Sequence, residues 1–248
     1  MARSGLAVLV TSLGILAAHP LVAEAQIPTK FENLKVLPED ISRDSLVQLM
    51  RSFSFATGLR CEGCHVLGPD GSFQGARFDL DDKTNKRKAR FMLRMVNRLN
   101  EEVLPRLPDR DDPPLAVECK TCHRGLQKPF LLRTELLRVV DSAGIDAAVA
   151  RYRELRRTRM ERGGYDFGQW EMNEVARQLD ETGRPDDAVA MLRVNEEYHP
   201  DSPDIPIELG RIYEEEGRTK DALSAYRRAL GRDSTNVFAR RRLEALSG

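Results

Sequence analysis

This sequence has few cysteines, few histidines, few aromatic residues and no net charge. Its 248 residues include four cysteines, four histidines and one tryptophan, and 39 basic residues balance 39 acidic ones. Because the net charge is zero, the chain has no overall attraction to nucleic acid or to an anionic membrane, and we expect no nucleic-acid partner. Aromatic residues make up only 6% of the chain. Aliphatic side chains or a cofactor must therefore fill its interior.

Long hydrophobic runs are absent beyond the first 25 residues. No later segment offers the roughly 20 apolar residues that span a bilayer. At the start, Arg3 precedes an apolar run over residues 5–18, and Ala23-Glu24-Ala25 gives a small-x-small end. This order is typical of a secretory signal peptide, so residues 1–25 are predicted to be one and the mature chain to be periplasmic. Membrane association would then require a partner or an uncleaved signal.

All four cysteines occur in two nearly identical pentapeptides. CEGCH covers residues 61–65 and CKTCH covers residues 119–123. In a CxxCH pentapeptide each thiol can bond a vinyl group of a porphyrin, and the adjacent histidine can bind the iron. The pattern predicts two covalently attached haem c groups. Their predicted binding residues are Cys61, Cys64, His65, Cys119, Cys122 and His123.

Three other uses of the cysteine pairs remain open. Export favours disulfides, although a disulfide needs no histidine after each pair. A four-cysteine zinc site is the second alternative, although the 54 residues between Cys64 and Cys119 are long for such a site. A thioredoxin-like redox motif is the third, and it expects a βαβ context that the sequence lacks.

Each iron needs a sixth ligand or keeps an open position. Histidine is scarce, since His19 lies in the predicted signal peptide and His199 in the C-terminal half. Methionine is the remaining soft ligand, and Met/His coordination raises the reduction potential of a haem. Met50 is the candidate for the first haem, while Met92 and Met95 compete for the second. The alternative for all three is core packing, the commoner role of a methionine on a helical stripe.

Hydrophobic periodicity predicts an all-α fold. A first helix begins after the capping residue Ser42 and ends at Gly58. Glycine and proline predict a loop over residues 67–75, and a second helix is predicted over residues 83–103. A helix with methionine, a loop and a CxxCH motif thus occurs twice. These elements define a predicted dihaem cytochrome c domain over residues 26–130.

The C-terminal half follows a 34-residue period. Residues of similar type recur at that spacing, as in the pairs Gly183 and Gly217, Ala188 and Ala222, and Leu179 and Tyr213. The period is typical of tetratricopeptide repeats. We predict a helical connector over residues 131–165 and tetratricopeptide-like repeats over residues 166–248. A plain bundle of helical hairpins that binds no peptide is an equally good interpretation.

Three blocks of the sequence resemble the cytochrome c subunit of photosynthetic reaction centres. These blocks are MRSFSFATGLRCEGCHV, KARFMLRMVNRLN and VECKTCHRGLQKP. The resemblance covers about residues 33–130 and implies a helix with a methionine ligand, a turn, and CxxCH on a following helix. It implies Met50 and Met92 as axial ligands and Met95 as a packing residue. Family members that serve reaction centres carry four haems, whereas this chain has two motifs and a repeat tail, so photosynthesis is not carried over.

These patterns together predict a periplasmic dihaem c-type cytochrome that carries single electrons between redox partner proteins. The repeat tail would dock a protein partner. With both irons held by methionine and histidine, we expect no substrate turnover and thus no enzyme. The alternatives are a dihaem peroxidase-type oxidoreductase with one open haem, and a haem-bearing module that binds partners.

A basic run marks the start of the second predicted helix. It contains Lys83, Lys86, Arg87, Lys88 and Arg90. Such a run can steer an acidic redox partner to the surface. Its commoner role is a solvated helix face.

Overall fold

The computed structural model describes residues 27–109 and 112–248, so the predicted signal peptide lies outside the described residues. Every regular element within these ranges is a helix, which confirms the all-α prediction. The one β contact in the same ranges is an isolated bridge between Val66 and Arg77. In the part of the chain described, no helix combines the length and apolar character needed to cross a membrane.

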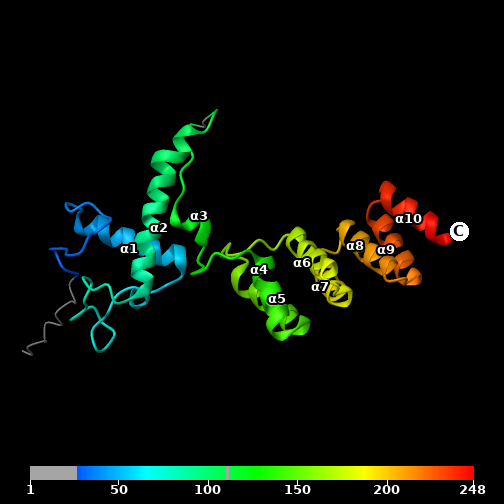
Figure 1. Ribbon diagram of the computed structural model, residues 1–248, viewed down its shortest axis with the longest axis horizontal. Helices are drawn as coiled ribbons and strands as arrows, with labels where there is room; N and C mark the ends of the chain where they lie inside the picture. Colours follow the sequence, from blue (N-terminus) through cyan, green and yellow to red (C-terminus); the bar gives the residue numbers. More distant parts are fainter. Residues whose placement is uncertain (1–26, 110–111) are drawn as a thin grey trace, which may run out of the picture.

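The molecule is elongated, with its N-terminal and C-terminal elements at opposite ends (Figure 1). The N-terminal part contains three α-helices: α1 (Arg43–Thr57), α2 (Thr84–Arg98) and α3 (Cys119–His123). The C-terminal part contains α4 (Leu132–Ala143), α5 (Ile145–Arg159), α6 (Gln169–Glu181), α7 (Pro185–Tyr198), α8 (Asp204–Glu215), α9 (Thr219–Arg232) and α10 (Val237–Ser247).

The predicted boundaries of α1 are confirmed. The Ser42 hydroxyl accepts a hydrogen bond from the Ser45 N–H at 3.2 Å and so satisfies a free donor of the first turn. Gly58 ends the helix in the left-handed conformation at φ 71°. Glycine adopts this conformation without the steric cost that a side chain brings.

The second predicted helix is also confirmed, but its last turn is not α-helical. After α2 the chain forms a π turn over Leu99–Val103 and a 3-10 turn over Leu104–Arg106. Pro105 has no N–H to donate, so the regular α-helical pattern cannot continue through it. In the π turn, the Asn100 side-chain amide bonds both backbone groups of Val117, each at 2.8 Å. The π turn thereby holds the segment that leads to α3.

The seven C-terminal helices pack in sequence as hairpins. Helix α4 pairs with α5, α6 with α7 and α8 with α9, and α10 packs against α9. One continuous cluster of buried side chains extends from Leu132 to Ala239. The segment 131–165, predicted as a connector, is folded as the hairpin α4–α5 and shares this core.

The 34-residue period reappears in the backbone of the C-terminal part. Gly183 and Gly217 both end a helix in the left-handed conformation, at φ 76° and 70°. At each turn the arginine after the glycine donates its N–H back to the preceding helix. These bonds join Arg184 to the Leu179 carbonyl at 2.9 Å and Arg218 to the Tyr213 carbonyl at 2.7 Å. Two successive hairpins therefore share one turn geometry.

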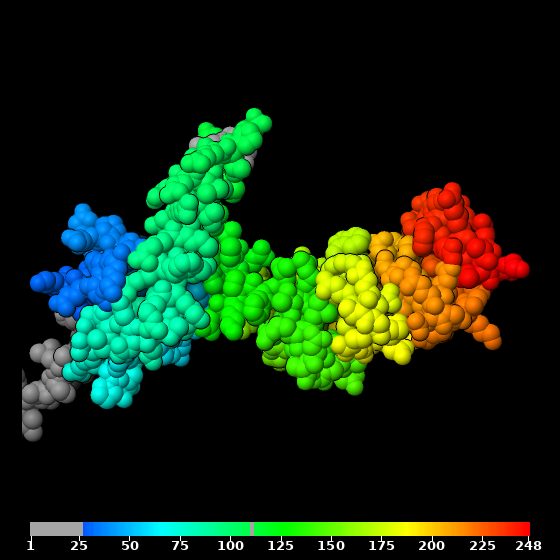
Figure 2. Space-filling view, viewed as in Figure 1, coloured from blue at the N-terminus to red at the C-terminus, as the bar shows by residue number. Residues whose placement is uncertain are grey.

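The N-terminal part has almost no apolar core of its own. Among residues 27–109 and 112–131, only Ala56 and Leu126 are buried apolar residues. Large apolar side chains lie on the surface instead, including Phe55 (77% exposed) and Phe91 (67% exposed). The end of α2 and the chain after it project from the surface in Figure 2. Because apolar burial is the main stabilising force of a fold, this part lacks the interior that its helices need.

Candidate functional site

The first CxxCH motif forms a single turn. Residues Cys61–Gly63 are 3-10 helical, and the His65 N–H donates to the Cys61 carbonyl at 2.9 Å. Cys61 is exposed and Cys64 is half-buried. No helix continues after this turn, in contrast to the following helix that the resemblance implies. In the loop that follows, the Gln74 carbonyl oxygen lies where a Cβ of Gly68 would be, so the chain can pass this close only at a glycine.

The second CxxCH motif is the short helix α3. Glu118 precedes it and its N–H donates to the Thr121 hydroxyl at 3.0 Å, which caps the helix. Arg124 and Gly125 follow His123 in the left-handed conformation, at φ 47° and 83°. These two residues turn the chain back, so that the Leu126 N–H donates to the His123 carbonyl at 2.7 Å.

The two motif histidines have different hydrogen bonds. His123 Nδ1 lies 2.8 Å from the Leu126 carbonyl oxygen. A carbonyl oxygen only accepts, so Nδ1 carries the proton and Nε2 is the nitrogen available to iron. His65 Nδ1 is buried and has no hydrogen-bond partner among the described residues, and its ring meets Phe78 edge-on at 5.1 Å. His199, by contrast, ends α7 and contacts a backbone carbonyl.

Burial and nearby charges shift the pKa values of two residues of the first motif. Burial, with the charges of Lys86 and Arg90, lowers the pKa of His65 to about 4. Burial also raises the pKa of the Cys64 thiol, and neighbouring Cys61 adds to the rise. Neutral imidazole is the form of histidine that binds a metal, so this environment keeps His65 ready to act as a ligand.

In the second motif, burial raises the pKa of the Cys119 thiol, and Glu118 and Cys122 contribute in the same direction. Cys122 is exposed, whereas Cys119 is half-buried. The carboxylate of Glu118 therefore acts on the second motif, whereas the cations Lys86 and Arg90 act on the first.

The two motifs adjoin at the C-terminal end of α1. The Gly125 N–H donates to the Ala56 carbonyl at 2.8 Å, and α1 packs against α3. Gly125 comes two residues after His123, and α1 ends four residues before Cys61. Residues 69 apart in the chain are thus joined by one backbone contact.

A polar bridge also links the two motifs through the start of α2. Asn85 Nδ2 donates to the Gly63 carbonyl inside the first motif at 3.1 Å. Gln127 Nε2, from the segment after the second motif, donates to Asn85 Oδ1 at 3.3 Å. Sequence reasoning missed these residues, since no periodicity or spacing distinguishes Asn85 or Gln127 from other surface amides.

The candidate methionine ligands lie in the middle of their helices. Met50 on α1 and Met92 on α2 are half-buried, whereas Met95 is 37% exposed. Eight residues separate Met50 from Gly58, which corresponds to about 12 Å along a helix. Their assignment as axial ligands stays a prediction.

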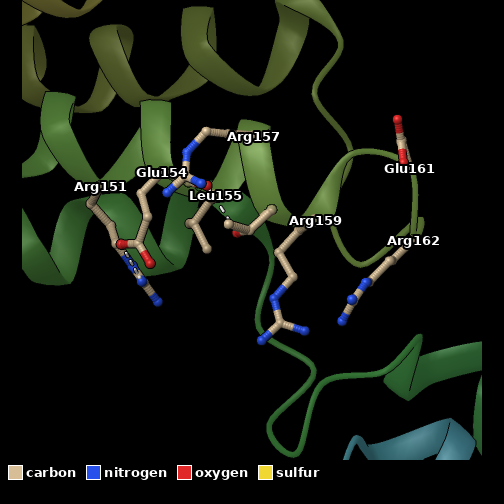
Figure 3. Close-up of a pocket in the computed structure, with 8 residues that line it drawn as sticks. Arg151, Glu154, Leu155, Arg157, Arg159, Glu161 and Arg162 are labelled. Carbon is tan, nitrogen blue, oxygen red and sulfur yellow. Dashed lines mark hydrogen bonds and ion pairs between the residues drawn. The ribbon is translucent and has the colours of Figure 1, made fainter.

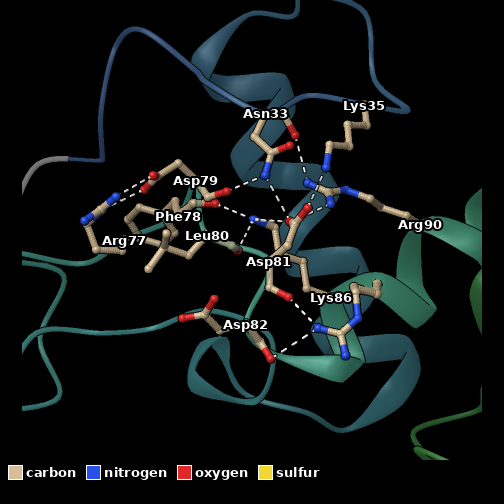
Figure 4. A network of polar contacts seen from close by, with 11 residues as sticks. Asn33, Lys35, Arg77, Phe78, Asp79, Leu80, Asp81, Asp82, Lys86 and Arg90 are labelled. Carbon is tan, nitrogen blue, oxygen red and sulfur yellow. Dashed lines mark hydrogen bonds and ion pairs between the residues drawn. The ribbon is translucent and has the colours of Figure 1, made fainter.

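Two residues of the basic run at the start of α2, Lys86 and Arg90, are part of an internal network (Figure 4). Lys86 is 9% exposed and donates to the Phe78 and Leu80 carbonyls, each at 2.6 Å. Asp81 accepts from Arg90 at 2.6 Å and from Lys35 at 2.7 Å. Neither Lys86 nor Arg90 is therefore free to contact a partner. They tie the first loop to α2.

A second group of arginines surrounds an open hollow of about 520 Å³ on α5 and the turn after it (Figure 3). Arg151 is paired with Glu135 and Glu154. Three other arginines at this hollow have no ion pair with a described residue, namely Arg157, Arg159 and Arg162. The same turn packs beside the second motif, since a Cβ at Gly164 would lie 3.6 Å from the Arg124 carbonyl oxygen.

The residues present fit two covalent haems. All four cysteines have free thiols. The exposed apolar side chains, including Phe55 and Phe91, leave apolar surface that a large flat cofactor would cover. In the described ranges, no three His, Cys, Asp or Glu side chains lie close enough to hold a metal ion, as a four-cysteine zinc site requires.

A scan of family models finds no match to this chain, and a comparison with curated proteins finds none either. The function must therefore be argued from the geometry of the chain's own residues.

Proposed function

We propose that this chain is a dihaem c-type cytochrome that carries single electrons between redox partner proteins. The observation that carries the proposal is the Ala56–Gly125 hydrogen bond, which joins the two CxxCH motifs in one unit. Two redox groups attached there would lie near each other. Proximity of this kind is what electron exchange between two cofactors requires.

The chain supplies the attachment and the ligands. Each haem, when bound, supplies one-electron oxidation and reduction of its iron. The cysteine pairs would hold the two porphyrins, with His65 and His123 as proximal ligands. Met50 and Met92 would complete the coordination and leave no open position for a substrate.

The small number of buried apolar side chains in the N-terminal part also supports the proposal. Residues 27–131 contain helices and turns with only Ala56 and Leu126 buried among their described apolar residues. Phe55 on α1 and Phe91 on α2 would pack against the haem faces, as aromatic side chains do with large apolar surfaces. The haems would then supply the interior that the chain lacks.

The C-terminal hairpins would form a tetratricopeptide-like tail that docks a protein partner. The repeated turns at Gly183 and Gly217 support the repeat assignment. The arginine hollow on α5 suits a partner with an acidic surface, because its unpaired guanidinium groups can pair with carboxylates. A plain hairpin bundle without this role is the alternative, and loss of partner binding in arginine variants would distinguish the two.

The resemblance to reaction-centre cytochrome subunits fits the same proposal, with this chain as a two-haem relative. Maturation of c-type haem requires export, so the predicted signal peptide and a periplasmic location belong to the proposal.

The test is a haem count on protein matured in a host that assembles c-type cytochromes. The pyridine haemochrome assay should give two covalent haems per chain. The double variants C61A/C64A and C119A/C122A should each retain one haem. A chain without covalent haem would overturn the proposal. Rapid binding of carbon monoxide by the reduced protein would instead favour a peroxidase-type oxidoreductase with an open iron.

A further inference from the structure

We infer that the haem at His65 has a higher reduction potential than the haem at His123, so that electrons pass from the second motif to the first. The inference rests on the proposed function. It assigns a direction to the electron flow, which the two similar pentapeptides do not distinguish.

The first difference is the hydrogen bond of each proximal histidine. His123 Nδ1 donates to the Leu126 carbonyl at 2.8 Å, whereas His65 Nδ1 has no partner among the described residues. A hydrogen bond from the second ring nitrogen raises the basicity of a metal-bound imidazole. A more basic ligand favours the ferric iron, which carries the larger positive charge. The haem at His123 is therefore the harder one to reduce.

The second difference is the charge beside each motif. Lys86 and Arg90 both act electrostatically on His65. Together with Lys35 they place three cations around Asp81, which offers a single carboxylate. Lys86 is buried, so solvent screens its charge less than that of a surface lysine. The buried positive charge of Lys86 would favour the ferrous iron and raise the potential at His65.

The second motif has no comparable buried cation. Glu118, Lys120 and Arg124 lie within two residues of it or inside it, and all three are exposed, so water and salt screen their charges. The buried Lys86 beside the first motif therefore distinguishes the two sites, and this difference and the histidine hydrogen bond shift the potentials in the same direction.

With both haems held by the cysteine pairs, His65 and His123, the electron transfer would be balanced within the molecule. The iron held by His123 would lose one electron and become ferric, and the iron held by His65 would gain it and become ferrous. No bond would form or break, and no proton or third reactant would be needed. A donor would deliver electrons at the second motif, beside the turn at Gly164 that adjoins the arginine hollow.

Spectroelectrochemical titration of the two-haem protein tests the inference. We expect two one-electron steps, with the potential of the haem at His65 higher by about 59 mV or more. This difference corresponds to an equilibrium constant of about ten for electron transfer to that haem. Arg90→Gln should lower the higher step only, and Arg90→Lys, which keeps the charge, should leave it in place. Glu118→Gln keeps an acceptor oxygen for the cap of α3 and should raise the lower step only.

Arg90→Gln changes the charge beside His65 and Glu118→Gln the charge beside Cys119. Either variant therefore tests the inference if the other fails to fold. Arg228→Gln, in α9, changes a charge of the C-terminal part and should move neither step. Two equal potentials in the wild type, or a shift of the lower step by Arg90→Gln, would overturn the inference while leaving the proposed function intact. Absence of haem would instead overturn the proposed function.

Discussion

Gly58 and Gly125 meet backbone to backbone at the point where the two CxxCH motifs adjoin. A Cβ on Gly58 would lie 2.5 Å from the Gly125 carbonyl oxygen, closer than nonbonded atoms approach. Gly58 also has a φ of 71°, in the left-handed region that favours glycine. Both the close contact and the backbone conformation therefore require glycine at this position.

Gly58→Ala should destabilise the N-terminal part and reduce haem content. The left-handed conformation alone costs about 1–2 kcal/mol for a residue with a side chain, and the clash with Gly125 adds to it. Gly71→Ala is the matched control, since Gly71 has a φ of 77° but no atom within 4 Å of the Cβ position. Chemical denaturation and haem content of both variants measure the difference. Equal losses in the two variants would show that the Gly58–Gly125 contact is unimportant.

Met50→Ala and Met92→Ala should each lower one reduction potential and change the spectrum of one haem. Loss of a methionine ligand removes the coordination that raises the potential. Met95→Ala is the control, because Met95 is more exposed and one turn away on α2. The check is a redox titration with absorption spectra of the ferric and ferrous protein. An effect of Met95→Ala without one of Met92→Ala would show that the ligand assignment is wrong.

Acid should release the loop before α2 from that helix. Hydrogen bonds from Lys35 and Arg90 hold the pKa of the Asp81 carboxyl well below its ordinary value of 3.8. A hydrogen bond from Arg77 lowers the pKa of Asp79 to about 2. Because the folded-state pKa values are lowered, this stabilisation is complete above pH 3.8 and is lost as the pH falls toward 2.

Amide hydrogen exchange of α2, followed from pH 5 downward, measures this loss. Asp81→Asn should show fast exchange already at pH 5, because the amide cannot form the charged pairs. Asp82→Asn is the control, since the Asp82 side chain has no ion pair with a described residue while its carbonyl still accepts from Arg87. Wild-type protection factors, which correct the observed rates for the intrinsic pH dependence of exchange, that stay constant down to pH 2 would contradict the role of the network.

The triple variant R157Q/R159Q/R162Q should slow electron exchange with a small acidic redox protein. Electrostatic steering accelerates such encounters by tenfold or more at low salt, so we expect about a tenfold loss that disappears as salt rises. Stopped-flow absorption at several ionic strengths measures it. The control R228Q/R240Q changes two arginines of the C-terminal helices outside the hollow. An equal loss of rate in that control would show that the electron exchange rate depends on the net charge of the chain and not on the arginines of the hollow.

Gly210→Ala should destabilise the C-terminal hairpins. A Cβ on Gly210 in α8 would lie 2.6 Å from the ring of Tyr226, which is fully buried. Overpacking of this kind costs about 1–3 kcal/mol. Gly231→Ala in α9 is the control, because its Cβ would meet nothing within 4 Å, and there the higher helix propensity of alanine should stabilise by up to about 1 kcal/mol. Thermal unfolding of the two variants should shift in opposite directions.

Local patterns in the sequence were sufficient to predict the helices and, for α1, the residues at both of its ends. Ser42 and Gly58 mark the boundaries of α1 because capping depends on residues within one turn of the helix end. The 34-residue period relates positions that share an environment in the fold, since Ala188 and Ala222, like Leu179 and Tyr213, are buried. The two CxxCH pentapeptides likewise predict haem attachment from the local sequence alone, since two thiols and a histidine must lie within one turn to serve one porphyrin.

Contacts between distant segments could be found only in the tertiary structure. No local pattern pairs Gly58 with Gly125, or joins Gly63 through Asn85 to Gln127, because these contacts depend on how the chain folds back on itself. The basic run at the start of α2 reads as a surface patch in the sequence, yet Lys86 is buried, since its Nζ donates hydrogen bonds to two backbone carbonyls of the folded loop. The sequence by itself thus determined the helices and the two candidate attachment motifs. The tertiary structure decided that the motifs adjoin and that their histidines differ, because hydrogen bonding and charge act through space and not along the chain.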